Sequence, residues 1–245
     1  MNYALILAAG VGQRMRNGGL PKQFLKLNGK PIIIYTLEKF DQMEEISQIV
    51  ISCHGDYIDY MQDLLKFYQI RKVAKIIVGG SERQASLLKG LDEVRSLSDH
   101  PQEDIVIIHD GVRPLVSQTT IAENIRIAMQ YGCAVTVHPV TESVVVTDSE
   151  DIQMGDFKKR ADTYTLTSPQ SFRISAVIKA YEQNARHEED SSIPLLDAAM
   201  VYANEGGTVH MVKEQNMNLK VTTPEDFYIL RSMLELEENK FIFGL

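Results

Sequence analysis

The sequence predicts an α/β fold, in which a doubly wound, mostly parallel sheet is covered by helices. Short apolar runs alternate with stretches of helical periodicity through the first 139 residues, and this alternation is typical of βαβ units. Several runs consist largely of valine and isoleucine, which indicates strands buried on both faces, as in a parallel sheet between helices.

Strands and helices are expected in strict alternation in this part of the chain. Each short apolar run predicts a strand, and each stretch with a 3.6-residue apolar period predicts a helix. The strands are expected at residues 3–7, 48–52, 74–78, 105–108 and 134–138, and the helices at residues 33–40, 57–67, 82–97 and 119–131.

The alternation of strand-like and helix-like segments ends after residue 139. β-Branched runs at 144–147 and 163–167 are separated by polar, acidic sequence, so residues of about 140–166 are expected to form an extended β-arm that does not pack within its own domain. Further elements are then expected: helices at 174–183 and 195–203, and a pair of strands at 208–212 and 218–222.

The last helix has a recognisable beginning. Thr223 is a suitable N-cap and Pro224 a suitable first helical residue. The whole chain, residues 1–245, is therefore expected to form one domain with an inserted β-arm.

Composition excludes several classes of function. The net charge of −8 does not favour non-specific binding to nucleic acids or anionic membranes. No apolar run is long enough for a membrane-spanning helix, and no signal peptide is recognisable. Cys53 and Cys133 lie in apolar surroundings without a CxxC spacing, so we expect buried, reduced thiols in a cytoplasmic protein.

A loop of small residues follows the first expected strand. In open α/β sheets ligands bind beyond the carboxyl ends of the strands, and free N–H groups in such a loop form an anion-binding nest. Two cations follow within the same stretch, so the loop is suited to a triphosphate. The residues concerned are Ala8, Ala9, Gly10, Gly12, Arg14 and Lys22.

Other interpretations of this loop fit less well. A dinucleotide fingerprint needs a third glycine where the chain has Met15, and the Walker A pattern is absent. A tight turn alone would explain the glycine pair Gly10 and Gly12, but it would not explain the cations Arg14 and Lys22.

Together with its neighbours the loop resembles a known family. "AAGVGQRM" and "LPKQF" are similar to the signature of CTP-dependent cytidylyltransferases that activate polyol phosphates. Further blocks match in order: "GGSERQAS", "HDGVRP", "TSPQSF" and "NLKVTTPED". The resemblance runs from residue 3 to about residue 235. It implies a Rossmann-like nucleotidyltransferase fold and an inserted β-arm for dimerisation.

The implied reaction converts CTP and a polyol phosphate into a CDP-polyol and pyrophosphate. The attacking phosphate has a second pKa of about 6 and is mostly a dianion at neutral pH, so no general base is required. Charge neutralisation is required, by fixed cations and Mg²⁺. By resemblance, Arg14, Lys22 and Lys220 hold the triphosphate and stabilise the reacting phosphate. The alternative for Lys220 is a solvated lysine on a strand.

The resemblance also implies residues for the base and the metal. Gly80 and Ser86 would recognise cytosine, with Arg83 supporting their loop; the alternative is an ordinary helix start capped by Ser81. Asp110 would bind Mg²⁺ or substrate hydroxyls, although an aspartate at a strand end is often only a turn former.

Acceptor binding is expected to involve both the body and the arm. Arg113 would bind the acceptor phosphate or brace Asp110. In the family the arm crosses to a second subunit, so Ser143 and Arg160 would hold the acceptor phosphate in the partner's site of a homodimer. The alternative for Arg160 is a place in a solvated charge run. His109 is expected to be a core histidine.

The identity of the acceptor is left open between two branches of the family. Val112 and Val145 replace an alanine and an arm lysine of the methylerythritol branch, which favours D-ribitol 5-phosphate over 2-C-methyl-D-erythritol 4-phosphate. Two alternatives remain: an inactive homologue that acts as a binding protein, and a nucleotidyltransferase for another base or a hexose phosphate.

Overall fold

The computed structural model of the chain describes residues 1–10, 20–147, 155–186, 197–214 and 217–243. Predictions for Gly12 and Arg14 concern residues outside these ranges.

The described residues form a seven-stranded central sheet, in the order β11-β7-β10-β6-β1-β4-β5. Its strands are β1 (Asn2–Ala8), β4 (Gln48–Cys53), β5 (Val73–Val78), β6 (Ile105–Asp110), β7 (Cys133–Pro139), β10 (Tyr164–Arg173) and β11 (Met211–Lys213). Only β10 runs antiparallel to its neighbours among these described strands. The predicted fold class, a mostly parallel α/β sheet, is confirmed.

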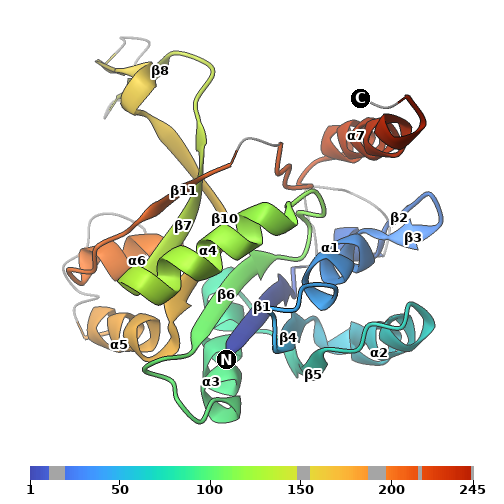
Figure 1. The fold of residues 1–245 in the computed structure, drawn as a ribbon, viewed down its shortest axis with the longest axis horizontal. Helices are drawn as coiled ribbons and strands as arrows, with labels where there is room; N and C mark the ends of the chain where they lie inside the picture. Colours follow the sequence, from blue (N-terminus) through green and yellow to red (C-terminus); the bar gives the residue numbers. More distant parts are fainter. Residues whose placement is uncertain (11–19, 148–154, 187–196, 215–216, 244–245) are drawn as a thin grey trace.

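Helices cover both faces of the sheet (Figure 1). One face packs against α1 (Ile32–Asp41), α2 (Ile58–Phe67) and α4 (Gln118–Tyr131), and the other against α3 (Arg83–Leu97), α5 (Ile174–Asn184) and α6 (Ala198–Asn204). Side chains of β1 point alternately to the two faces of the sheet. Ala4 and Ile6 pack with the helices of the first face, and Tyr3 and Leu5 pack with those of the other face. This explains why the strand is apolar at nearly every position.

The last helix, α7 (Pro224–Phe243), is anchored at its beginning. Thr223 is the predicted cap, since its hydroxyl accepts a hydrogen bond from Asp226 N at 3.5 Å. The Asp226 carboxylate accepts in return from the N–H groups of Thr222 and Thr223 at 2.7 and 2.8 Å, which completes a capping box. Leu230 and Leu234 pack on Val221 and on the small hairpin of β2 (Lys26–Leu27) and β3 (Lys30–Pro31).

Two predicted elements are wrong. Residues 218–222 form no strand, and β11 pairs in parallel with β7 instead. Residues 164–167 belong to β10 of the central sheet rather than to the arm, because Tyr164 pairs with Pro139 and Leu166 with Val137. An alternating apolar pattern predicts an extended chain but not its partner.

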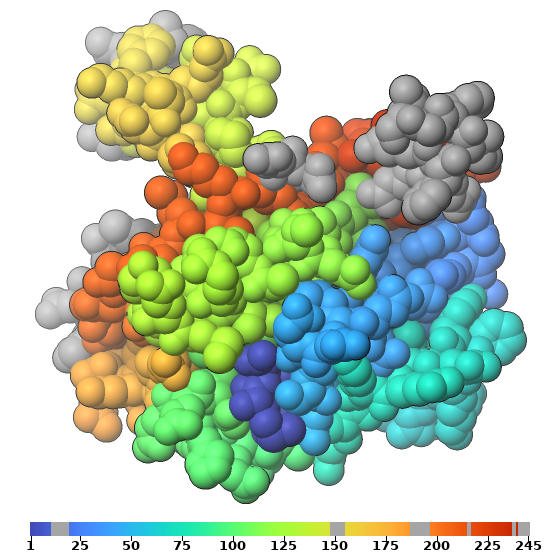
Figure 2. Space-filling model, viewed as in Figure 1, coloured from blue at the N-terminus to red at the C-terminus, as the bar shows by residue number. Residues whose placement is uncertain are grey.

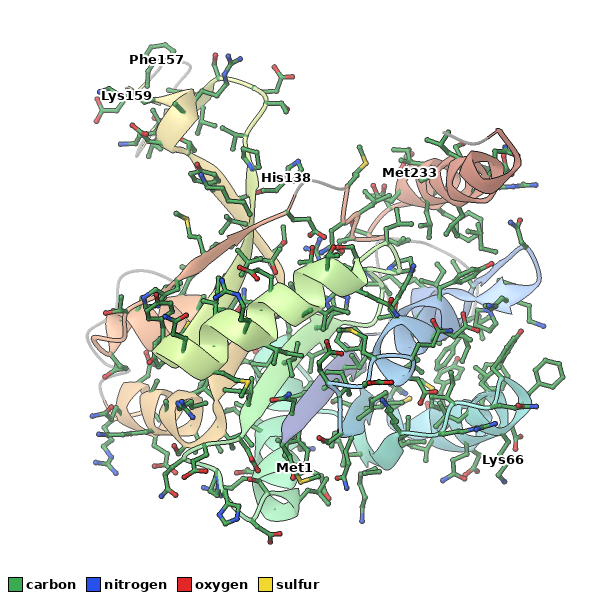
Figure 3. The ribbon with its side chains drawn as sticks, viewed as in Figure 1. Met1, Lys66, His138, Phe157, Lys159 and Met233 are labelled. Carbon is green, nitrogen blue, oxygen red and sulfur yellow. The ribbon has the colours of Figure 1, made fainter. Side chains whose placement is uncertain are left out.

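The arm itself extends away from the body of the molecule (Figures 1 and 2). It carries β8 (Val144–Val146) and β9 (Asp156–Lys158), which pair with each other and with no other strand in the described part of the chain. Figure 3 labels Phe157 and Lys159 in the arm and His138 near its base. Phe157 is 68% exposed, so the arm buries little apolar surface within this chain.

None of the helices in the described ranges is both long and apolar enough to span a membrane.

Candidate active site

The carboxyl ends of four strands meet at one edge of the sheet. The register pairs Leu7 with Asp110, Ala8 with Cys53, and Cys53 with Val78, so the loops after β1, β4, β5 and β6 begin side by side. A cavity of about 510 Å³ lies at this edge. It is lined by Leu7, Ala8, Ala9, Gly10, Lys22, Gln23, His54, Gly80, Ser81, Glu82, Arg83, Ser86, Asp110, Val112, Lys220 and Thr222.

At one wall of the cavity two glycines lie in close contact with small residues. A Cβ on Gly79 would lie 2.3 Å from Ala9 Cβ, and a Cβ on Gly80 would lie 2.3 Å from Ala85 Cβ. Ser86 holds this loop, because its hydroxyl accepts a hydrogen bond from Gly80 N at 3.0 Å and donates one to Glu82 O at 2.9 Å. Both glycines are therefore needed for the shape of the wall.

The start of α3 differs from the expected one. The helix begins at Arg83 with Glu82 at the N-cap position, without a side-chain hydrogen bond, so the alternative with Ser81 as cap is wrong. Arg83 lies next to Asp110 across the cavity, with its guanidinium 3.6 Å from Oδ1.

The opposite wall comes from the segment after the first loop. Lys22 begins a short 3₁₀ helix, Lys22–Phe24, and its neighbour Gln23 is almost fully buried. Gln23 Nε2 donates hydrogen bonds to Ala8 O at 2.6 Å and to Gly10 O at 3.0 Å. These bonds fix the start of the loop and place Lys22 at the cavity.

Asp110 is the electrostatic centre of the cavity. Its carboxylate is 9% exposed and contacts three cations: Lys220 Nζ at 3.0 Å, Arg113 Nε at 3.1 Å and Arg83 at 3.6 Å. Burial alone would raise the pKa of Asp110, but these three cations hold it well below its usual range. One ionised carboxylate thus gathers three positive charges, which leaves a net positive charge for an anionic ligand.

Arg113 acts behind the cavity rather than in its lining. The side chain braces Asp110, as one of the two predicted alternatives has it, and its NH1 donates to Asn218 O at 2.7 Å. Lys220 is one third exposed at the cavity. The alternative of a solvated strand lysine does not describe it, since it pairs with Asp110.

His109 is a structural residue, as expected. It is fully buried, with Nε2 3.1 Å from Arg113 O and Nδ1 3.1 Å from the Ser168 hydroxyl. Burial lowers the pKa of His109 to about 4, so the ring is neutral at physiological pH. It supports the loop that carries Asp110 and Arg113.

The arm residues stand apart from this cavity within the chain. Ser143 and Arg160 are exposed, and Arg160 NH1 donates a long bond of 3.4 Å to Thr141 O. Neither side chain is among those that line the cavity. Their role in a partner's site stays a prediction.

A metal ion would have to be held largely by its substrate. The described residues contain no group of three or more histidine, cysteine, aspartate or glutamate side chains that could hold one. Mg²⁺ is commonly bound through one or two carboxylates together with substrate phosphates and water. Asp110 fits this donor set, because among the described residues the cation nearest to its Oδ1 is Arg83, at 3.6 Å, whereas Oδ2 has two closer cations.

Some cavity residues were missed by sequence reasoning. Gln23, His54 and Thr222 line the cavity, and Gly79 shapes it. Gly79 directly follows the predicted strand 74–78, and His54 lies two residues beyond the predicted strand 48–52, so their position near a strand end was the available signal. Gln23 and Thr222 lie within the matching blocks "LPKQF" and "NLKVTTPED", but nothing in the residues themselves pointed to the cavity, because a buried amide and a capping hydroxyl are common in any fold.

Comparisons with known proteins agree with this geometry. The sequence model of the 2-C-methyl-D-erythritol 4-phosphate cytidylyltransferase family matches residues 3–235. A protein of Vibrio parahaemolyticus named ribitol-5-phosphate cytidylyltransferase is 40% identical over 244 residues, and one of Streptococcus agalactiae with the same name is 35% identical over 246 residues; both matches cover 100% of each chain.

Solved structures share the fold. The 4-diphosphocytidyl-2C-methyl-D-erythritol synthase of Anaerococcus prevotii superposes with a TM-score of 0.80 at 24% identity, over 96% of both chains. The 2-C-methyl-D-erythritol 4-phosphate cytidylyltransferase of Francisella tularensis gives 0.74 at 24% identity, over 94% of this chain and 98% of the other. Taken with the match of the family model, these findings show that the chain is a cytidylyltransferase and belongs to the 2-C-methyl-D-erythritol 4-phosphate cytidylyltransferase family.

Proposed function

We propose that this enzyme transfers the cytidylyl group of CTP to D-ribitol 5-phosphate, which gives CDP-ribitol and pyrophosphate. The choice of D-ribitol 5-phosphate as the acceptor rests on one observation. The chain is similar, over the full length of both chains, to two proteins named ribitol-5-phosphate cytidylyltransferase. The cavity supports the chemistry, because its cations surround the place where phosphates would meet.

The reaction is an in-line displacement at the α-phosphorus of CTP. An oxygen of the acceptor phosphate forms the new P–O bond, and the bond to the bridging oxygen of the β-phosphate breaks as pyrophosphate leaves with the electron pair. The acceptor phosphate is already mostly a dianion at neutral pH. The residues therefore need to attract and orient the two substrates and to neutralise the charge of their phosphates. No side chain has to remove a proton.

Fixed cations supply that neutralisation. Lys22 and Lys220 line the cavity from two separate segments, so they can contact the triphosphate from two sides. Asp110 holds Lys220 and Arg83 in place before the substrate arrives, and such preorganisation stabilises developing charge without further rearrangement. When bound, Mg²⁺ would supply additional charge neutralisation at the triphosphate, with Asp110 Oδ1 as the protein ligand.

The wall formed by Gly79, Gly80 and Ser86 is the proposed site for cytosine. Gly80 and Ser86 line the cavity, and their mutual hydrogen bond holds the loop in place, so polar groups of this loop can meet the edge of a base. A site that hydrogen-bonds one base leaves polar groups unpaired with another, so CTP should be preferred over UTP.

The arm is proposed to complete the acceptor site of a second subunit. The exposed pair of strands, with Val146 51% and Phe157 68% exposed, would lose its open edges on pairing with another copy. Arg160 and Ser143 would then meet the acceptor phosphate in the partner's cavity. The homodimer, the Mg²⁺ ion and the cytoplasmic location stay predictions.

A second acceptor, 2-C-methyl-D-erythritol 4-phosphate, is supported by the name of the family model. Val112 lines the cavity and Val145 lies on β8. At both positions the residue departs from the methylerythritol branch, and both departures favour ribitol.

Turnover with each acceptor tests the proposal. Purified protein is supplied with Mg²⁺, CTP and either acceptor, and pyrophosphate release and the CDP-polyol are measured. Release with D-ribitol 5-phosphate at the higher kcat/KM supports the proposal, and a higher kcat/KM with the methylerythritol substrate contradicts it. UTP in place of CTP tests the base, and equal rates would overturn the cytosine site.

A further inference from the structure

Lys220 lies on a segment without regular secondary structure. Residues 217–222, which all belong to the described ranges, form neither a helix nor a strand, so the position of the lysine depends on individual hydrogen bonds. On one side of Lys220 the backbone holds the segment, because Val221 N donates to Val112 O at 3.0 Å. On the other side the segment is held through Asn218.

Asn218 is a buried residue that joins this segment to the rest of the fold. It is 7% exposed. Its side-chain Nδ2 donates a hydrogen bond to Ser168 O on β10 at 2.6 Å, and its backbone carbonyl accepts one from Arg113 NH1 at 2.7 Å. The side chain therefore ties the segment to the central sheet, and the carbonyl held in this way orients the Arg113 guanidinium.

The residue at the other end of this tie supports Asp110. The Ser168 hydroxyl accepts a hydrogen bond from Asp110 N at 3.2 Å and lies 3.1 Å from His109 Nδ1. The other ring nitrogen, His109 Nε2, lies 3.1 Å from Arg113 O. A closed ring of contacts thus runs from Asn218 through Ser168, His109 and Arg113 back to Asn218.

This ring places two of the three cations around Asp110. Arg113 Nε and Lys220 Nζ lie 3.1 and 3.0 Å from Asp110 Oδ2. Asn218 is bonded to Arg113 directly, and it precedes Lys220 by two residues in the chain. Without its amide, the segment would lose its tie to β10 on that side of Lys220. A displacement of about 1 Å at reacting groups can cost about 100-fold in rate.

We propose that Asn218 is a positioning residue for cytidylyl transfer: its amide ties the segment to β10 and so holds Lys220 and Arg113 beside Asp110. The proposal rests on the proposed function of the cavity. It assigns Asn218 no contact with substrate, since Asn218 is not among the described residues that line the cavity.

Asn218→Ala removes the amide that donates to Ser168 O. The variant should lower kcat by about 10- to 100-fold, because Lys220 and Arg113 are displaced from the reacting phosphates. The KM for CTP should change less, because Lys22, Gly80 and Ser86 are untouched. Steady-state kinetics with Mg²⁺ and CTP measures both constants.

A second buried asparagine provides the matched control. Asn124 is 0% exposed, and its Nδ2 donates to Thr120 O at 2.9 Å and to the Thr136 hydroxyl at 2.8 Å. The described structure gives it no contact with a cation of the cavity. Asn124→Ala should therefore lower the melting temperature as Asn218→Ala does, but it should leave kcat close to wild type.

The decisive measurement is a double-mutant cycle with Lys220→Ala. If Asn218 acts through Lys220, Asn218→Ala costs much less in the Lys220→Ala background than in wild type, and the loss that remains is the part due to Arg113. A merely structural role would lower kcat by the same factor in both backgrounds, and that result would overturn the proposal. So would an unchanged kcat in a folded Asn218→Ala enzyme.

Melting temperatures show whether each variant is folded. If Asn218→Ala is not, Asn218→Ser takes its place, because it keeps a polar group that is one bond too short for the contact with Ser168 O. It should show a loss of kcat with the same dependence on Lys220.

The outcomes separate this proposal from the proposed function. The assay uses whichever acceptor wild type turns over, so a preference for the methylerythritol substrate contradicts the proposed acceptor alone. Near-normal turnover of Lys220→Ala would contradict the proposed function of the cavity, and the role of Asn218 with it. An additive cycle with an impaired Lys220→Ala enzyme would contradict only the role of Asn218.

Discussion

The cavity and the arm differ in how firmly they hold the cationic side chains that are expected to bind phosphate. In the cavity, a nearly buried Asp110 holds three cations within 3.6 Å, and its backbone is buried in the sheet. In the arm, Arg160 is exposed and has one long hydrogen bond to Thr141 O. The cavity is organised within one chain, whereas the arm would need a partner to fix its arginine.

This difference predicts different kinds of sensitivity. Charges that are fixed before binding stabilise a transition state strongly, so their loss should appear in kcat. An exposed cation such as Arg160, which begins a short 3₁₀ helix after β9, should contribute mainly to acceptor binding, because an exposed side chain loses rotamer freedom when it binds.

The largest effect is expected from the cavity lysines. Lys22→Ala or Lys220→Ala should lower kcat by about 10²–10³-fold, the scale of removing one preorganised contact to the transition state. Steady-state kinetics with the accepted substrate measures it. Lys26→Ala, at an exposed position on β2, is the matched control. A variant at either cavity position that keeps near-normal turnover would show that its lysine has no role in the chemistry.

A smaller effect is expected in the arm. Arg160→Ala should lower kcat/KM for the acceptor by about 10- to 100-fold, since a hydrogen bond to a charged group contributes about 1.5–3 kcal/mol. The KM for CTP and the melting temperature should not change. Lys159→Ala, at the neighbouring exposed lysine, is the control. Equal losses in the two variants would mean that general charge matters rather than Arg160.

The smallest effect is expected on stability. Asp110→Asn should lower the free energy of unfolding at pH 7 by about 1–3 kcal/mol, less than for a fully buried pair, because Lys220 and Arg83 are about one third exposed. The pKa of Asp110 in the folded protein is depressed below the ordinary value of 3.8. Its contribution to stability is therefore present above that ordinary value and is lost as the pH falls from there toward the folded pKa.

Urea unfolding at pH 7 and at pH 3 measures this contribution. The difference between wild type and Asp110→Asn should shrink at the lower pH. Asp63→Asn, on the exposed side of α2, should show little difference at either pH. A difference that grows on acidification would contradict the charge arrangement around Asp110.

The same contrast explains what the sequence could predict. Strands such as β1 and β6 are apolar at nearly every position, so their burial and their place in a parallel sheet follow from the pattern. The roles expected for Asp110 and Gly80 came from the resemblance to the cytidylyltransferase family. Their position next to strand ends at the edge of the sheet agrees with that expectation, because both line the cavity.

Long-range partners were not predictable in this way. Residues 218–222 have the composition of a strand, but Asn218 hydrogen-bonds to Ser168 and Arg113 instead of a neighbouring strand. Tyr164 extends the central sheet because it pairs with Pro139.

We expect the cavity of one chain and the arm of another to form a single active site. Mixing Arg160→Ala chains with Lys22→Ala chains under conditions of subunit exchange tests it directly. In random heterodimers one site has both residues intact and the other lacks both, so a 1:1 mixture should recover about a quarter of wild-type activity. Activity no higher than that of the separate variants, with exchange confirmed, would show that Arg160 does not act across subunits.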